Sequence, residues 1–259
     1  MLGQRFVIVD RAYYDELGGE YFGDSSYATY NYLGGYLSGL IKRRHFEAAL
    51  RFVDRHDPGP KAVDMGCADG VFLPSLDRRF DHVRGIDIRP QFIAVAQHLI
   101  DRMHLANTTV ACTQDLDRAG VLGVAGGDND VVFLLETLEH IGNRADFYGS
   151  KIEFLEMAAD MVRPGGRIVV SVPNMVGISL LVQHVGLRVT RRYVEPISVS
   201  ELARGVVLRD VASMEKRWNN DDHLGFNHRL LERRFGEIGR VEVRRNLGFS
   251  VFYVIQVGR

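Results

Sequence analysis

The chain has 259 residues, of which 46% are hydrophobic and 25% are charged, a composition that excludes collagen-like, coiled-coil and disordered proteins. Its 32 Lys and Arg residues against 33 Asp and Glu give a net charge of -1, so no overall positive field favours a nucleic-acid partner. No apolar run reaches the roughly 20 residues that span a bilayer, and the N-terminus lacks the layout of a signal peptide. We therefore expect a cytoplasmic protein without a membrane partner, either a monomer or a homodimer.

Residues 1–60 precede the first regular pattern of the chain and are rich in tyrosine. We predict a helix from about Tyr36 to His56 and, for the whole segment, an N-terminal helical cap or lid over the active site. Aromatic side chains at helical spacing also serve as core packing. Both interpretations therefore stay open for Tyr13, Tyr14, Tyr21, Tyr27, Tyr30, Tyr32 and Tyr36.

From Lys61 onward, short β-rich runs alternate with helical segments, which is typical of a parallel sheet with helices on both faces. An insertion at about 174–220 interrupts this rhythm, and two final runs around 246–248 indicate an antiparallel hairpin. We predict an α/β domain at 61–259 whose seven-stranded sheet is mostly parallel. The expected strands are Lys61–Met65, His82–Asp87, Thr108–Cys112, Asp130–Leu135, Arg167–Val172, Arg240–Arg245 and Phe249–Val257, and the expected helices include Pro90–Met103 and Ile152–Val162.

A glycine-bearing segment, 64–70, follows the first of these strands and opens a helix. Glycines at such a turn let backbone amides approach a ligand closely, at the carboxyl edge of the sheet where open α/β folds bind ligands. A dinucleotide fingerprint G-x-G-x-x-G would compete for this position, but the chain reads Gly66, Ala68 and Val71 there, which disfavours a nicotinamide cofactor.

The same segment resembles motif I of class I S-adenosylmethionine (SAM) dependent methyltransferases, an acidic residue followed by x-G-x-G-x-G. Asp64, Gly66 and Gly70 match this motif, whereas Ala68 departs from it. The resemblance implies a Rossmann-like methyltransferase fold in which the turn, with Cys67, holds the methionine part of SAM and Asp64 acts on its ammonium group. The alternative is that the glycines serve only a strand-to-helix turn.

Acidic residues also end the next two predicted strands. Asp87 can accept hydrogen bonds from the two hydroxyls of a ribose, and its position matches motif II of the family. Asp115 resembles the acidic residue that accepts a hydrogen bond from the adenine amino group, although an aspartate in a surface turn is an alternative. The resemblance adds Ile88, Leu116 and Glu136 to the expected SAM contacts.

The segment Glu136-Thr137-Leu138-Glu139-His140 follows the fourth predicted strand. Residues at positions i, i+3 and i+4 share a helix face, so Glu136, Glu139 and His140 are expected to converge, with His223 as a fourth candidate. The pattern E-x-x-E-H resembles that of metal-dependent methylases of small-RNA 2'-hydroxyls and of ubiquinone-pathway catechol O-methyltransferases. It implies a Mg²⁺ or Mn²⁺ site at Glu136, Glu139, His140 and His223.

Relatives with a similar L-E-H-I stretch use no metal, so a catalytic base or a donor-pocket role at these residues is an alternative, as is structural capping. We take Glu139, His140 and His223 as the candidate catalytic residues. The leading functional hypothesis is O-methylation of a small metabolite, sugar or lipid-linked precursor. The alternatives are a small-RNA 2'-O-methyltransferase, a SAM-binding protein without catalysis and, more distantly, a nicotinamide-dependent oxidoreductase.

Overall fold

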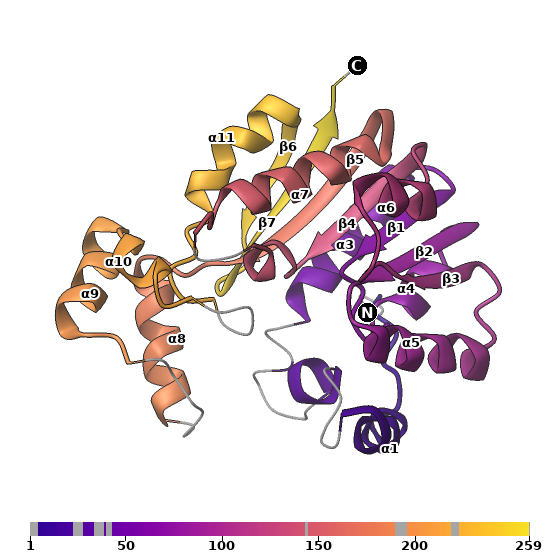
Figure 1. Ribbon diagram of the computed structural model, residues 1–259, viewed down its shortest axis with the longest axis horizontal. Coiled ribbons are helices and arrows are strands. Elements are labelled where there is room, and N and C mark those ends of the chain that lie inside the picture. The colour runs from indigo at the N-terminus through magenta and orange to yellow at the C-terminus, as the bar shows by residue number, and fades with distance from the viewer. Residues whose placement is uncertain are drawn as a thin grey trace. The chain divides into compact units, whose positions relative to one another are not determined.

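The computed structural model describes residues 5–22, 28–33, 39, 43–142, 145–189, 196–218 and 223–258. Its strands form one seven-stranded sheet in the order β3-β2-β1-β4-β5-β7-β6, drawn in Figure 1. Two compact units divide the chain, one made of 1–135, 157–169 and 256–259 and the other of 136–156 and 170–255. They are described separately below.

The first unit contains the four strands that the sequence predicted best. β1 (Lys61–Met65), β2 (His82–Asp87) and β3 (Thr108–Cys112) have the predicted bounds, and β4 (Asn129–Leu135) begins one residue earlier. All seven residues of β4 are buried, as expected for a strand covered on both faces. β1 pairs in parallel with β2 and β4, and β2 with β3, so their carboxyl ends share one edge of the sheet.

Helices follow these strands, as the alternating pattern predicted. α5 (Pro90–Met103) begins at a proline in the first helical position, where proline's fixed φ and its lack of an amide hydrogen are tolerated. The helix is followed by His104 in the left-handed conformation. α4 (Leu73–Asp77) and α6 (Arg118–Ala125) are shorter.

The described residues before β1 include the helical segments α1 (Arg11–Phe22), a π-helical turn, η1 (Thr29–Leu33), and α3 (Arg44–His56). α3 begins later than predicted, and the remaining residues of the expected helix fall partly outside the described part of the chain. Tyr13, Tyr14 and Tyr32 are buried, which fits a packing role. Of Tyr21 and Tyr30 the structure describes only the backbone, and Tyr27 and Tyr36 lie outside the described residues. The lid role of 1–60 stays a prediction.

One boundary prediction was wrong in the segment between α7 (Gly149–Asp160) and β5 (Val162–Pro173). The run Pro164-Gly165-Gly166 was expected to separate helix from strand, but the strand already includes it. Arg163 is held at the start of the strand by an ion pair of 2.5 Å with Asp130. Gly165 takes up a φ of +77°, which only glycine adopts without strain.

The second unit contains the insertion, with α8 (Ile178–Val189), α9 (Val199–Ala203), the π-helical turn η3 (Arg204–Leu208) and α10 (Ala212–Glu215). It has a small core of its own, formed by Val176, Leu180, Val211, Met214 and Leu224. After it come α11 (Arg229–Ile238), β6 (Gly239–Asn246) and β7 (Ser250–Val257). β6 and β7 are neighbours in the sheet, and their three-residue connection requires the predicted antiparallel pairing.

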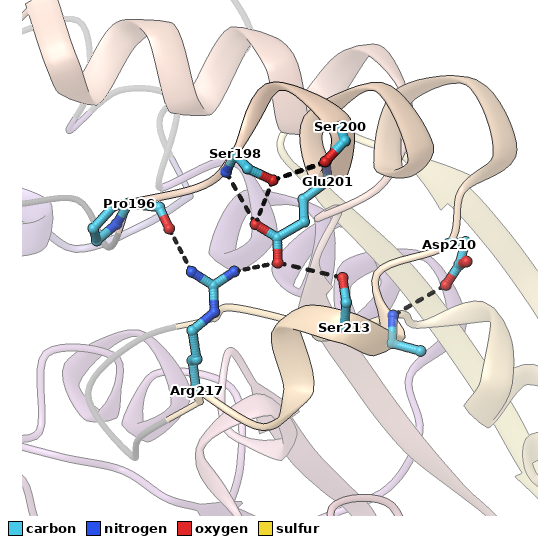
Figure 2. Close-up of polar contacts among 8 residues, drawn as sticks. Pro196, Ser198, Ser200, Glu201, Asp210, Ser213 and Arg217 are labelled. Atoms are coloured by element: carbon cyan, nitrogen blue, oxygen red, sulfur yellow. Dashed lines mark hydrogen bonds and ion pairs between the residues drawn. The ribbon is translucent and has the colours of Figure 1, made fainter.

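Glu201 links α9 to α10 within the insertion through the hydrogen bonds that Figure 2 shows. One carboxylate oxygen accepts hydrogen bonds from the amide and the hydroxyl of Ser198, each 2.9 Å long. The other oxygen accepts from Ser213 at 3.4 Å and from Arg217 at 2.6 Å. A capping box and an ion pair on one carboxylate therefore stabilise this segment. Within the described residues, no helix has the length and apolar character needed to cross a membrane.

Candidate functional site

The bend after β1 has the geometry that its glycines predicted. Gly66, Ala68 and Gly70 have φ angles of +87°, +47° and +81°, a conformation that costs an L-residue roughly 1–2 kcal/mol. The amides of Gly66 and Cys67 donate to the Ile86 carbonyl at 2.8 and 3.1 Å. A Cβ at Gly70 would lie 3.0 Å from the Cβ of Ala96. The bend therefore packs tightly between β2 and α5.

Asp87, at the end of β2, is bonded to this bend. One of its carboxylate oxygens accepts a hydrogen bond of 2.9 Å from the Ala68 amide, and the other accepts one of 2.9 Å from the Arg89 amide. Burial raises the pKa of Asp87, and the amide hydrogen bonds oppose this rise. Each carboxylate oxygen keeps a further lone pair, so the side chain can still accept hydrogen bonds from a diol.

Asp64 is a buried carboxylate on β1, directly before the bend. Burial and, to a smaller extent, the charge of Asp87 raise the pKa of Asp64 to about 7. A cation such as an ammonium group would relieve this unfavourable environment by favouring the ionised form. Burial also raises the pKa of the Cys67 thiol, so Cys67 is a packing residue that offers only its backbone to a ligand.

The remaining residues of the predicted donor site lie where β2 and β3 end. Ile88 and Leu116 expose 62% and 39% of their surface, and Asp115 is exposed in the turn after β3. Apolar side chains left open beside an acidic group suit a flat base with one polar edge. In the first unit, the structure thus brings Asp64, the bend and Asp87 together, and places Ile88, Asp115 and Leu116 on the adjoining strand ends.

A second group of polar side chains lies in the other unit. The Glu139 carboxylate is fully buried, and its Oε1 lies 3.8 Å from Nε2 of His140 and 3.8 Å from Nε2 of His223. The two imidazole rings are 5.0 Å apart between centroids. One ligand atom from each of the three residues lies within 4.8 Å of the others. We call Glu139, His140 and His223 the acidic-histidine cluster.

The expected helix face of this cluster was wrong. Glu136 has a left-handed φ of +54°, and only Leu138–His140 forms a short 3-10 turn, so Glu136, Glu139 and His140 do not converge by helical spacing. Glu136 is not one of the three residues that meet. Tertiary contact with the segment carrying His223 assembles the cluster instead, and Glu136 acts on it through its charge.

Glu139 lies in an environment that disfavours an isolated negative charge. Neither of its carboxylate oxygens accepts a hydrogen bond from another described residue. Burial raises the pKa of Glu139 well above its usual range, and the charge of Glu136 adds to this effect. A buried carboxylate beside two imidazole nitrogens, without hydrogen-bond donors, is a donor set that suits a divalent cation or a shared proton. The residues therefore fit a metal ion, with Glu136 outside the set.

Sequence reasoning missed two residues that serve these sites. The Asp69 carboxylate, within the bend, accepts a hydrogen bond of 2.6 Å from the Ala28 amide and so attaches the N-terminal segment to the bend. Lys151 of α7 is fully buried near the acidic-histidine cluster. Neither residue belongs to a spacing pattern, and an isolated Asp or Lys is usually exposed, so the sequence held no signal for them.

The chain is similar to known methyltransferases. Residues 38–206 match a family model described as a methyltransferase domain. Two ubiquinone biosynthesis O-methyltransferases are similar to this chain. The one from Cupriavidus pinatubonensis is 31% identical, over 56% of this chain and 57% of its own length. The one from Xylella fastidiosa is 27% identical, over 66% of this chain and 72% of its own length. The structure of magnesium protoporphyrin IX methyltransferase from Synechocystis with bound S-adenosylhomocysteine (SAH) superposes on this chain with a TM-score of 0.57 at 15% identity. The superposition covers 96% of this chain and 98% of that one.

Proposed function

The chain belongs to the class I SAM-dependent methyltransferases, because residues 38–206, more than half of the chain, match the methyltransferase family model. We propose that it methylates a hydroxyl oxygen of a small molecule. The observation that carries the choice of oxygen is the acidic-histidine cluster, because a hydroxyl must lose its proton to become a good nucleophile. The imidazoles of His140 and His223 are partly exposed, and both contact the buried Glu139. They can accept a proton while Glu139 holds them in place.

In the proposed reaction, the acceptor oxygen forms a bond to the methyl carbon as the bond from that carbon to the sulfonium sulfur breaks. The electron pair of the broken bond stays on sulfur, which leaves as the neutral thioether of SAH. The hydroxyl proton passes to His140 or His223. Asp64 binds the ammonium group of the donor, and Asp87 accepts hydrogen bonds from its ribose.

The two relatives support a small acceptor, because both are named as O-methyltransferases of ubiquinone biosynthesis. The alignments span 57% and 72% of the length of these two relatives. We therefore propose only the class of acceptor: a small metabolite, a sugar or a lipid-linked precursor that carries a hydroxyl. The cytoplasmic location and the monomeric or homodimeric state stay predictions.

A divalent cation is a second part of the proposal. Glu139, His140 and His223 would hold Mg²⁺ or Mn²⁺ through one oxygen and two nitrogen atoms. Such a cation, when bound, lowers the pKa of a coordinated hydroxyl. The same three side chains also suffice for proton removal by themselves, so the proposal of O-methylation does not depend on the cation.

The experiment that tests the proposed function compares acceptors that differ only in their nucleophile. The purified chain is incubated with SAM and either 3,4-dihydroxybenzoate, a simple sugar or matched amines, and products are identified by mass spectrometry. We expect methylated hydroxyl compounds, and about 10²–10⁴-fold lower rates with His140→Ala. The matched variant Glu153→Gln, on the exposed face of α7, should retain the rate. Methylation of amines alone would contradict the proposal, as would stabilisation by NADH in place of SAH.

A further inference from the structure

Lys151 of α7 places an ammonium group in the interior of the second unit. Its side chain is fully buried, and its Nζ donates a hydrogen bond of 2.5 Å to the Ile141 carbonyl. The same Nζ lies 4.0 Å from the ring centre of Phe147 and 4.6 Å from that of Trp218. One carbonyl and two aromatic faces thus surround the charge.

Both segments that carry the acidic-histidine cluster contact this ammonium group. Ile141, whose carbonyl accepts the hydrogen bond, directly follows His140 in the chain. Trp218 lies five residues before His223 and donates a hydrogen bond of 3.1 Å from its indole nitrogen to the Glu139 carbonyl. Lys151 therefore reaches Glu139 and His140 through the backbone, and the His223 segment through the indole ring.

Packing alone does not explain a lysine at this position. Burying an ammonium group is costly, whereas an apolar side chain of similar volume is often neutral or stabilising. Burial lowers the pKa of Lys151 to about 8, while the charges of Glu139 and Glu215 oppose this decrease. The cation is thus kept in an environment that disfavours it. Cation–π contacts and a charge-assisted hydrogen bond are the interactions that an apolar residue cannot replace.

We propose that Lys151 is a positioning residue for methyl transfer: through the Ile141 carbonyl and the Trp218 ring it holds Glu139, His140 and His223 in their reactive arrangement. This inference rests on the proposed function of the cluster as the group that removes the acceptor proton. Lys151 itself contacts neither donor nor acceptor in this role. It acts on the geometry of the three side chains, as the outer partners of metal ligands and catalytic bases do.

The test removes the charge and keeps an unbranched side chain that is only one atom shorter. Lys151→Met is compared with Lys216→Met, a matched change at an exposed lysine two residues before Trp218. Four properties are measured in both variants: the melting temperature, the affinity for SAH, kcat and KM with 3,4-dihydroxybenzoate, and the ¹⁵N signals of the His140 and His223 imidazoles. Trp218 is the only tryptophan of the chain, so its fluorescence reports directly on the ammonium group beside it.

We expect Lys151→Met to lower kcat by about 10–100-fold, the usual effect of losing an outer partner, and to shift the two imidazole signals and the tryptophan emission. SAH affinity should stay within about twofold of the wild type, because the donor residues are not altered. Lys216→Met should match the wild type in every measurement. A folded Lys151→Met protein with wild-type kcat and wild-type imidazole signals would overturn the inference, and so would an equal loss in Lys216→Met.

A second variant decides the question if Lys151→Met does not fold. Trp218→Phe keeps an aromatic ring beside the ammonium group but removes the hydrogen bond to Glu139, so it should lower kcat and shift the same imidazole signals; unchanged values would overturn the inference. If the wild type methylates no hydroxyl compound, the proposed function fails by itself. The imidazole signals still show in that case whether Lys151 holds the cluster.

Discussion

The carboxylate of Asp87 and the amide of Ala68 share a hydrogen bond of 2.9 Å, which joins the end of β2 to the bend after β1. The residue expected to bind the ribose thus also fixes the turn expected to hold the methionine part of SAM. Ala68 lies in the left-handed region, at a φ of +47°. The hydrogen bond helps to hold the bend in this unfavourable conformation, so the two parts of the donor site depend on each other.

Changing Asp87 to Asn should therefore weaken donor binding through two effects at once. An amide side chain loses the charge-assisted hydrogen bonds to the Ala68 and Arg89 amides and to a ribose. Such bonds contribute about 1.5–3 kcal/mol each, so we expect SAH affinity to fall by about 10–100-fold in isothermal titration calorimetry. Asp81→Asn, at the exposed residue just before β2, is the control and should bind SAH normally. Equal affinity in both variants would show that Asp87 does not contact the donor.

Ala68 departs from the family motif at a position where the backbone favours glycine. Because its φ is +47°, Ala68→Gly should remove conformational strain of about 1–2 kcal/mol. The greater freedom of glycine in the unfolded chain offsets about 0.4–1 kcal/mol of this gain. We expect a net increase in the free energy of unfolding of up to about 1.6 kcal/mol, measured by urea denaturation.

The control for this substitution is the same change in a helix. Ala94 lies in the interior of α5, where glycine costs about 1 kcal/mol relative to alanine. Ala94→Gly should therefore destabilise the protein while Ala68→Gly stabilises it. If both variants lose stability, the left-handed conformation at Ala68 is not strained.

The strands and the positions of the acidic residues at their ends could be predicted because local signals determine them. The all-apolar run of β4 and the proline that begins α5 each specify an element by themselves, and acidic residues at the ends of parallel strands meet at one edge whatever the loops do. The bend was predictable for a related reason, since glycine, as at Gly66 and Gly70, takes up a positive φ with the least strain.

The acidic-histidine cluster was predicted for a reason that the structure does not support. Helical spacing suggested that Glu136 joins Glu139 and His140, but the positive φ of Glu136 turns the chain away from a helix. A single non-glycine residue in this conformation leaves no sequence pattern. The same holds for Lys151, whose burial depends on rings that come from distant parts of the sequence.

The raised pKa of Asp64 should make donor binding depend on pH. In the free protein this pKa is about 7, mainly because of burial and partly because of Asp87, and a bound ammonium group stabilises the ionised form. Affinity for SAH should therefore be constant above about pH 7 and fall by up to tenfold per pH unit below it. Calorimetric titrations from about pH 5.5 to 8 measure this slope. Asp64→Asn should bind SAH weakly, with an affinity that does not change with pH. If the affinity of the wild type for SAH is also independent of pH, Asp64 is not the partner of the ammonium group.

Glu139 should be required for binding a divalent cation. Glu139→Gln keeps the shape of the side chain but removes the charge between the two imidazoles, so Mn²⁺ affinity should fall by at least about 100-fold, the upper end of what an outer partner costs. The melting temperature of the metal-free protein should not fall, because a neutral amide is easier to bury than a carboxylate without hydrogen-bond donors.

Electron paramagnetic resonance of Mn²⁺ measures this binding without an acceptor. Glu153→Gln is the control for the loss of one acidic residue and should bind Mn²⁺ as the wild type does. If the wild type and Glu139→Gln give the same Mn²⁺ signal, the cluster does not hold a cation, and proton removal by the imidazoles alone remains.

His228, the residue before α11, should make the protein sensitive to acid. Burial lowers the pKa of His228 to about 4 from the ordinary 6.5, assisted by Arg244 and other arginines and opposed by Glu232. Between these two values the unfolded chain binds a proton that the folded chain does not. Its contribution to stability is therefore complete above pH 6.5 and is lost as pH falls towards 4, by roughly 3.4 kcal/mol in total. Melting curves at several pH values should show a smaller decrease for His228→Gln than for the wild type, whereas His82→Gln, at an exposed histidine of β2, should follow the wild type. The idea fails if the acid sensitivity of His228→Gln equals that of His82→Gln, because the imidazole of His228 would then be protonated equally in the folded and unfolded chains.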